Sequence, residues 1–303
     1  MIERRNLAAS VRQRLTNRAR QRGEDVELVF IRYALERLLY RLGRSDQRER
    51  FILKGAMLFA LWSGEPYRAT RDLDLLGLGD SGADVIRAAV RSLCELPVEE
   101  DGIGYAADGI RVESTADEEG YPVVRVRLNA SLAGARIPVH IDIGFGDVVT
   151  PAAKEMDYPT LLDLPAPRIF AYPRETVVAE KYEAIVSLGM FNSRMKDFYD
   201  LWVLASSFPF EAATLATSIT GTFRRRGTGL GVEIPVGLSE EFANDPLKRQ
   251  QWDAFIGRSR LTLKPPSLVD VVAFLATFLL PPVERLRHDP SPDLRWPPGG
   301  PWQ

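Results

Sequence analysis

The chain has 303 residues with 39 basic and 41 acidic side chains, so its formal charge is −2 and it is not a general polycation. One cysteine, Cys94, and two histidines exclude a disulfide framework and a Cys- or His-rich zinc cluster. The first residues lack the apolar segment of a secretory signal, and no apolar run reaches the roughly 18 to 20 residues of a membrane span. We therefore expect a cytoplasmic protein without a membrane partner.

Hydrophobic periodicity predicts mixed helices and strands in the N-terminal half. Apolar residues at helical spacing predict helices over residues 7–22, 26–42, 51–62 and 83–93. Gly43 and Gly64 are typical of the ends of the second and third of these helices. Alternation predicts strands over residues 72–76, 123–128 and 137–145, with loops and short strands over 97–122. The 13 arginines among residues 1–50 fit either a solvated helical surface or an arm facing a polyanion.

The C-terminal half changes character after a proline-rich stretch at residues 159–173, where we place a domain boundary. The first domain is predicted to span residues 1–165 and the second 166–303. Helical spacing predicts helices over residues 175–188, 195–206, 210–225, 246–255 and 267–280. Seven of the 21 prolines fall in the tail, residues 281–303, which predicts a segment without regular helix.

Two carboxylates share a face of the predicted strand over residues 72–76. Residues two apart in a strand point the same way, so Asp72 and Asp74 project together while Leu73 and Leu75 enter the core. Adjacent carboxylates repel one another unless a cation lies between them, and hard oxygen ligands suit Mg²⁺ held together with substrate phosphates. A solvated strand edge is the alternative interpretation of an isolated Asp-x-Asp pair.

Further candidates flank this pair in the sequence. Asp142 lies amid apolar residues of the strand over 137–145, where a carboxylate is costly unless paired or bound to metal. Upstream, Lys54 and Gly55 precede an apolar segment, and a glycine that opens a helix lets a phosphate approach backbone N–H groups. Together these features indicate a metal and nucleotide site.

The order of these motifs resembles the nucleotidyltransferase superfamily, whose fold is polymerase-β-like. More specifically, residues 54–58 and 68–75 resemble the signature block of AbiEii-type nucleotidyltransferase toxins, the group that includes MenT-like enzymes. Residues 180–185 and 194–201 resemble that family's downstream block, and the likeness extends over about residues 25–205. The resemblance implies an α/β (α+β) fold, a mixed sheet flanked by helices with a mainly helical C-terminal part that completes the active site.

The resemblance also implies residue roles. Asp72, Asp74 and Asp142 would hold two Mg²⁺ ions, and Lys54, Gly55 and Ala56 would lie at the nucleotide. The family often has a second glycine or a serine where this chain has Ala56 and Met57. Lys181 would neutralise the NTP phosphates, and Asp197 would orient Lys181 or the acceptor hydroxyl. A surface lysine and a local ion-pair network are the structural alternatives for these two residues.

The activity implied is transfer of a nucleoside monophosphate from an NTP to an acceptor hydroxyl by a toxin of a toxin–antitoxin or abortive-infection system. A tRNA 3′ end is the first choice of acceptor, which would block translation and growth, and a cognate antitoxin would be the protein partner. Transfer to a protein or a small molecule, and a degenerate nucleotide-binding module, remain alternatives. The basic run Arg224, Arg225 and Arg226 either grips a nucleic-acid backbone or is a solvated helix end.

Overall fold

The computed structural model describes residues 2–116, 122–231, 233–288 and 294–303. Contacts within the chain group these residues into two compact units. Unit 1 comprises Met1–Gly146 and Lys154–Ala171, and unit 2 comprises Asp147–Ala153 and Tyr172–Gln303. A loop of the N-terminal half, residues 147–153, therefore packs with the C-terminal helices.

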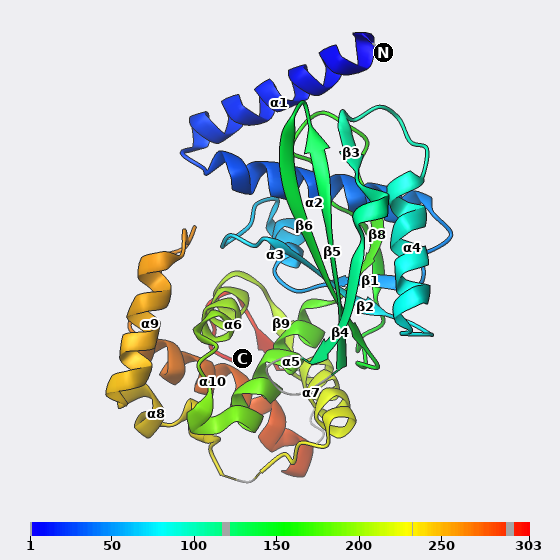
Figure 1. The fold of residues 1–303 in the computed structure, drawn as a ribbon. Coiled ribbons are helices and arrows are strands. Elements are labelled where there is room, and N and C mark those ends of the chain that lie inside the picture. The colour runs from blue at the N-terminus through cyan, green and yellow to red at the C-terminus, as the bar shows by residue number, and fades with distance from the viewer. Residues whose placement is uncertain (1, 117–121, 232, 289–293) are drawn as a thin grey trace. The chain divides into compact units, whose positions relative to one another are not determined.

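Unit 1 is built on a mixed sheet of eight strands among its described residues (Figure 1). The sheet order is β3-β5-β6-β2-β1-β8-β7, and β4 pairs with β5. The strands are β1 Phe51–Lys54, β2 Asp72–Gly77, β3 Ile103–Tyr105, β4 Arg111–Ala116, β5 Pro122–Leu132, β6 Ala135–Phe145, β7 Lys154–Asp157 and β8 Arg168–Ala171. β2 runs parallel to β6 and antiparallel to β1. The strand that carries Asp72 and Asp74 therefore lies beside the strand that carries Asp142.

Helices α2 Val26–Arg44 and α4 Ala83–Glu95 cover one face of this sheet, and α1 Ile2–Arg22 packs against α2. Helix α3 Met57–Ser63 follows β1 and packs against it. The Asp25 side chain accepts hydrogen bonds from the first N–H groups of α2, which begins that helix. Leu38 and Leu42 of α2 and Leu93 of α4 pack against Leu73 and Leu75 of β2. Since these odd-numbered residues of β2 face the helices, its even-numbered residues face the opposite side of the sheet.

The prediction that residues 51–62 form a single helix is wrong. Residues 51–54 are strand β1, whose Phe51, Ile52 and Leu53 are buried between β2 and β8, and α3 begins only at Met57. A short run of apolar residues fits a doubly buried strand as well as a helix, so periodicity alone misassigned it. Gly64 does end α3, in the left-handed conformation with φ 81°.

Gly43 does not end α2, contrary to the sequence prediction. The helix continues to Arg44 and is capped by Ser45. A Cβ atom at position 43 would lie 2.4 Å from the carbonyl oxygen of Arg168 in β8. Glycine is therefore needed at this position because the helix approaches a strand closely.

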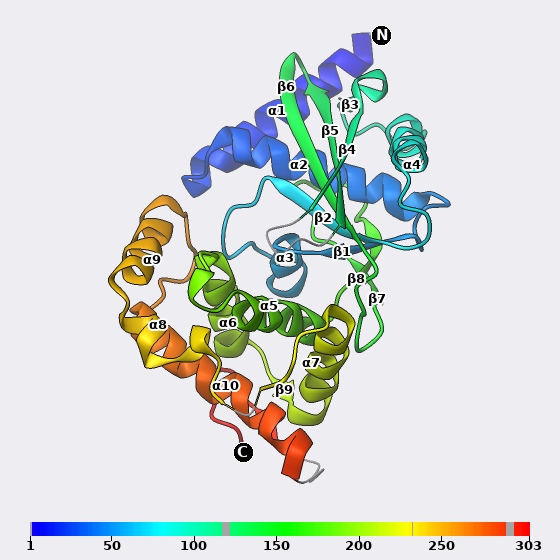
Figure 2. The same cartoon turned by 60° about the horizontal axis from the view of Figure 1, so that its bottom comes forward.

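Unit 2 is mainly helical, and each of the five predicted helices is found there. Its helices are α5 Arg174–Leu188, α6 Met195–Ser207, α7 Ala212–Arg226, α8 Glu240–Asn244, α9 Pro246–Arg258 and α10 Leu268–His288, with short 3-10 turns at Gly189–Phe191 and Val236–Leu238. Helix α8 was not predicted. α5 packs against both α6 and α7, and α10 packs against α6 and α7 (Figure 2). Two short strands, β9 Phe210–Glu211 and β10 Arg295–Trp296, pair antiparallel. None of the helices in the described parts of the chain is long and apolar enough to cross a membrane.

The predicted absence of helix beyond residue 280 is wrong for residues 281–288. α10 continues through Pro281 and Pro282, and residues 289–293 lie outside the described part of the chain. Pro282 has no N–H to donate to the carbonyl of Phe278, and the indole Nε1 of Trp302 donates to that carbonyl instead, at 3.0 Å. The indole Nε1 of Trp296 donates to Ala205 at 2.7 Å, so the tail is held by specific contacts.

Candidate active site

Strand β2 presents Asp72 and Asp74 on the face of the sheet opposite to α2 and α4. Both aspartates are partly accessible, whereas Leu73 and Leu75 are buried at 1% and 3% exposure. This is the alternation that the sequence predicts for a strand with one covered face. The pair lies near the centre of the sheet, between β1 and β6, and is not an edge feature.

The register of the sheet adds a third carboxylate. In the parallel pairing of β2 with β6, Asp72 is opposite His140 and Asp74 is opposite Asp142. On the other side of β2, Lys54 of β1 is opposite Asp74. Residues opposite one another in neighbouring strands share a face, so Asp142, Asp74 and Lys54 form one row across three strands. The structure thus brings together the unit 1 residues that the sequence nominated.

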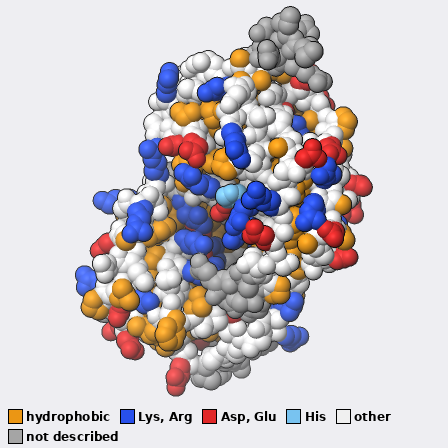
Figure 3. Space-filling model, in the orientation of Figure 1, with side chains coloured by type: hydrophobic (Ala, Val, Ile, Leu, Met, Phe, Trp, Pro, Cys, Tyr) orange, Lys and Arg blue, Asp and Glu red, His pale blue; other side chains and the backbone are white. Residues whose placement is uncertain are grey.

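The same row continues to Arg125 in β5, which sequence reasoning missed. Arg125 is opposite Asp142 and donates from Nε to Oδ1 and from Nη2 to Oδ2, both at 2.8 Å. The hydrogen bonds to Asp142, followed by the charge of that carboxylate, raise the pKa of Arg125. The alternation Val-Val-Arg-Val-Arg-Leu already showed that Arg125 faces the polar side, but only the β5–β6 register shows which acid it meets. Figure 3 shows basic and acidic side chains interspersed over the strands of unit 1.

Gly55 connects β1 to α3 in a conformation that favours glycine, with φ 73°. A Cβ atom there would lie 2.0 Å from Oδ2 of Asp74, so the missing side chain makes room for this carboxylate. Ala56 adopts helical angles before Met57 and offers no side-chain cap to α3. Binding of a phosphate by this turn stays a prediction. The close approach of Gly55 to Asp74 shows that the turn lies next to the candidate metal ligands.

The unit 1 carboxylates have the chemistry of a Mg²⁺ site. Mg²⁺ is commonly held by one or two carboxylates together with phosphate oxygens of the substrate, and Asp72 and Asp74 offer such oxygens on one face. Within the described residues no three His, Cys, Asp or Glu side chains are gathered closely enough to hold a metal ion by themselves. Asp142 is engaged by Arg125 through both oxygens. The donor set therefore fits a metal that completes its coordination with substrate oxygens.

In unit 2, Lys181 of α5 meets the acidic side chains of α6. Its Nζ lies 2.5 Å from Oδ1 of Asp197 and 2.9 Å from Oδ2 of Asp200. Arg194, one turn before Asp197, places its Nε 2.6 Å from Oδ2 of the same carboxylate. The side chain of Lys181 is 13% exposed and those of Asp197 and Asp200 are buried. Lys181 is therefore no snorkelling surface lysine, and the network is not a solvated helix cap.

The electrostatics of Asp197 follow from its two cations. Burial acts to raise the pKa of this carboxyl, but the charges of Lys181 and Arg194 outweigh burial and lower it below its ordinary value. Asp197 is thus a fixed anion that holds the Lys181 ammonium in one position. The spacing of Arg194, Asp197 and Asp200 had predicted that all three share a helix face, and their common contacts confirm it.

The basic run at the end of α7 divides into two kinds of side chain. Arg226 is largely buried and donates to Glu183 at 2.8 Å, with Asp147 at 3.5 Å. Burial acts to lower the pKa of Arg226, but Glu180, Asp147 and Glu183 raise it above the ordinary value. Arg226 is thus part of a structural ion-pair network. The sequence analysis did not identify Glu183 and Asp147 as its partners. Arg224 and Arg225 have exposed side chains. The prediction that this run contacts a nucleic-acid backbone therefore applies to these two residues.

Comparison with known proteins identifies the family. The model of the family described as "Nucleotidyl transferase AbiEii toxin, Type IV TA system" matches residues 37–274. The chain belongs to this AbiEii family. It is accordingly a nucleotidyltransferase of the type IV toxin–antitoxin class, as the resemblance of its motifs predicted. The matched residues include Asp72, Asp74, Asp142, Lys181 and Asp197.

Two solved structures are also similar to the chain. One is a protein from H. pylori named as a candidate nucleotidyltransferase, with 16% identity, a TM-score of 0.47, and coverage of 83% of this chain and 94% of that one. The other is JHP933 from Helicobacter pylori, with 14% identity, a TM-score of 0.48, and coverage of 82% and 89%. A search of curated proteins found no match.

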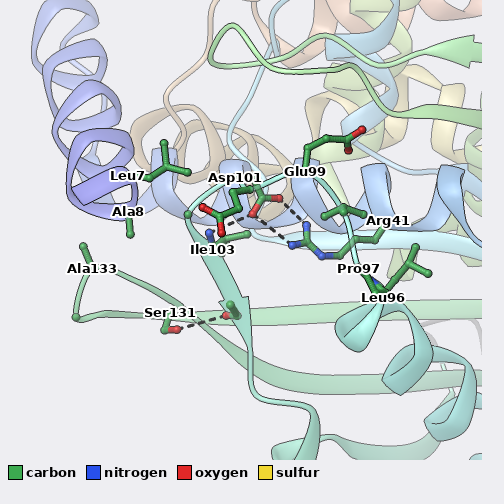
Figure 4. Close-up of a pocket in the computed structure, with 15 residues that line it drawn as sticks. Leu7, Ala8, Arg41, Leu96, Pro97, Glu99, Asp101, Ile103, Ser131 and Ala133 are labelled. Carbon is green, nitrogen blue, oxygen red and sulfur yellow. Dashed lines mark hydrogen bonds and ion pairs between the residues drawn. The ribbon is translucent and has the colours of Figure 1, made fainter. Parts of the chain in front are cut away.

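This AbiEii-family protein also has a pocket of about 780 Å³ in unit 1, between the start of α1, the segment after α4 and the β5–β6 turn (Figure 4). Arg41 lines it and donates to Asp101 at 2.7 Å, and Arg37 donates to the same buried carboxylate at 3.3 Å. None of the nominated site residues lines this pocket. The paired charges of this pocket anchor α2 to the segment before β3, so its chemistry differs from that of Asp72, Asp74 and Asp142.

Proposed function

We propose that this AbiEii-family enzyme transfers a nucleoside monophosphate from an NTP to an acceptor hydroxyl in a Mg²⁺-dependent reaction. The observation that carries the proposal is the row across β2 and β6 in which Asp72, Asp74 and Asp142 share one face beside Gly55. The buried Lys181–Asp197 pair of unit 2 supports it, because a lysine held in one position is suited to a phosphate.

Each residue has a defined task in the proposed reaction. Asp72, Asp74 and Asp142 would hold the metal, two ions being the expected number. When bound, Mg²⁺ supplies charge neutralisation of the triphosphate and polarises the reacting oxygens. Lys181 binds the phosphates through its ammonium, and Asp197 positions Lys181. The proposal assigns the carboxylates to a core of residues 1–165 and the phosphate-binding lysine to residues 166–303.

The reaction breaks one bond and forms one. The acceptor hydroxyl oxygen attacks the α-phosphorus, the bond from that phosphorus to the β-phosphate oxygen breaks, and pyrophosphate leaves. Asp142 helps accept the proton of the hydroxyl. Little covalent chemistry falls to the protein, so positioning and charge stabilisation account for most of the catalysis.

We propose the 3′ end of tRNA as the acceptor, with a block of translation and growth as the consequence and a cognate antitoxin as the partner that limits it. Exposed arginines at the end of α7, Arg224 and Arg225, support a polyanionic acceptor. We propose the cytoplasm as the location of this reaction, because NTP and tRNA, the two proposed substrates, are present there.

The test is incubation of the full chain with each α-³²P-labelled NTP, Mg²⁺ and total bacterial RNA. We expect label in a tRNA-sized band, and its loss in Asp74→Asn and in Lys181→Met. Asp84→Asn is the matched control, because Asp84 is a strongly exposed acid of unit 1 on α4. Removal of divalent ions with EDTA should abolish labelling by the wild type.

The outcomes separate the alternatives. Label in a protein band would move the acceptor to protein. Label in neither RNA nor protein, with labelling of an added small molecule that carries a hydroxyl, would indicate transfer to small molecules. No labelled product with any acceptor would contradict the enzymatic proposal, and wild-type labelling by Asp74→Asn would refute the metal assignment.

A further inference from the structure

We propose that Arg125 is the counter-ion that occupies Asp142 until metal binds, so that Arg125 and the divalent ion compete for this carboxylate. The inference rests on the proposed function, because it concerns the metal site assigned there. It adds a residue that the motifs do not contain and gives that residue a role in setting metal affinity. Arg125 is a positioning residue in this proposal and acts only through Asp142.

The charge sequence across the sheet supports the competition. From β4 to β1 the row reads Glu113, Arg125, Asp142, Asp74 and Lys54, each opposite the next in the strand register. Two carboxylates are thus adjacent in the middle of the row, with a basic residue on each side. Adjacent carboxylates repel one another, and a cation that approaches either of them relieves that repulsion. Arg125 supplies such a charge to Asp142 from within the protein.

The geometry shows why the two cations exclude each other. Arg125 uses two nitrogens, Nε and Nη2, and satisfies both oxygens of Asp142 at 2.8 Å. A planar guanidinium that binds both oxygens covers the outer edge of the carboxylate, where a metal ion would also bind. A divalent ion close to Asp142 would in addition repel the guanidinium. Metal entry at Asp142 therefore requires Arg125 to give up at least one of its two hydrogen bonds.

The accessibility of the pair makes such an exchange feasible. The side chains of Arg125 and Asp142 are 39% and 24% exposed, so water can replace each partner when the pair opens. The Lys181–Asp197 pair is buried, and its separation would cost far more free energy than separation of the Arg125–Asp142 pair. A bidentate pair of this accessibility is stable in the absence of metal and weak enough to yield to a divalent cation.

Arg127 provides a matched comparison on the same strand and face. It lies two residues after Arg125, and its Nη1 donates to Glu113 at 3.3 and 3.1 Å. Its side chain is 44% exposed, close to the value for Arg125. Replacement of either arginine removes one positive charge near the row, but only replacement of Arg125 frees Asp142. The difference between the two variants therefore isolates the competition from the general change in charge.

The experiment measures Mn²⁺ binding to the full chain without nucleotide, by electron paramagnetic resonance of the free ion. We expect Arg125→Gln to lower the Kd for Mn²⁺ by about three- to tenfold, the range set by an accessible bidentate ion pair. Arg127→Gln should change the Kd less than twofold. In an Asp142→Asn background, Arg125→Gln should no longer tighten binding, which closes a double-mutant cycle.

Each result decides the proposal. An unchanged or weakened affinity in Arg125→Gln would overturn it, as would equal tightening by Arg127→Gln or tightening that persists in the Asp142→Asn background. Thermal unfolding of each variant without metal confirms that the fold is intact. The readout is independent of nucleotidyl transfer. If Asp74→Asn abolishes labelling while Arg125→Gln leaves the Kd unchanged, the counter-ion inference fails and the proposed function stands.

Discussion

Gly55→Ala separates the cost of backbone strain from the displacement of a catalytic carboxylate. The φ of Gly55 is 73°, where an alanine costs about 1 kcal/mol or somewhat more. The new Cβ would also lie 2.0 Å from Oδ2 of Asp74, whereas ordinary contact begins at 3.4 Å, so Asp74 must retreat by about 1.4 Å. A misplacement of this size costs about a hundredfold in rate when the displaced group is catalytic.

Gly64→Ala is the control because it shares the strain without the clash. Gly64 has φ 81°, and a Cβ there meets no atom within 4 Å. Both variants should unfold about 2–4 °C below the wild type, as expected for a loss of about 1 kcal/mol in a unit of this size. Only Gly55→Ala should lose nucleotidyl transfer in the ³²P assay. Equal activity of the two variants would refute the reasoning that Gly55 makes room for Asp74.

Two further predictions concern the buried ion pairs of unit 2. Asp197→Asn should lower the free energy of unfolding by about 3 kcal/mol at pH 7, since it leaves Lys181 and Arg194 without their shared anion. Because the folded-state pKa of Asp197 is lowered, its contribution is present above the unfolded pKa, about 3.9, and is lost as the pH falls through the folded value. Urea unfolding should therefore show the gap to wild type narrowing below about pH 4, and a gap independent of pH would contradict this. Arg226→Met should lower the free energy of unfolding by about 3 kcal/mol because Glu183 is fully buried, whereas exposed Arg224→Met should change it by less than about 0.5 kcal/mol. Similar urea midpoints for these two variants would show that the buried network contributes little.

Periodicity predicted most elements because the covered face of each is marked by apolar residues. The strand alternation of β2 and β6 and the helical spacing of α5 and α6 agree with the structure to within a few residues. Residues 51–54 were misassigned because a strand buried on both faces has no alternation that distinguishes it from a helix. The helix across Pro281 and Pro282 was missed because its compensating donor, Trp302, lies twenty residues further along the chain.

For the site, the sequence by itself determined which side chains share a face of one element. A period of two places Asp72 with Asp74, and a spacing of three places Asp197 with Asp200, whatever the rest of the fold. Only the tertiary structure decided what stands opposite them. The β5–β6 register brings Arg125 to Asp142, and the packing of α5 on α6 brings Lys181 to Asp197. Register and helix packing depend on the whole core, since a shift of one residue would turn each strand's polar face inward, and no local pattern specifies them.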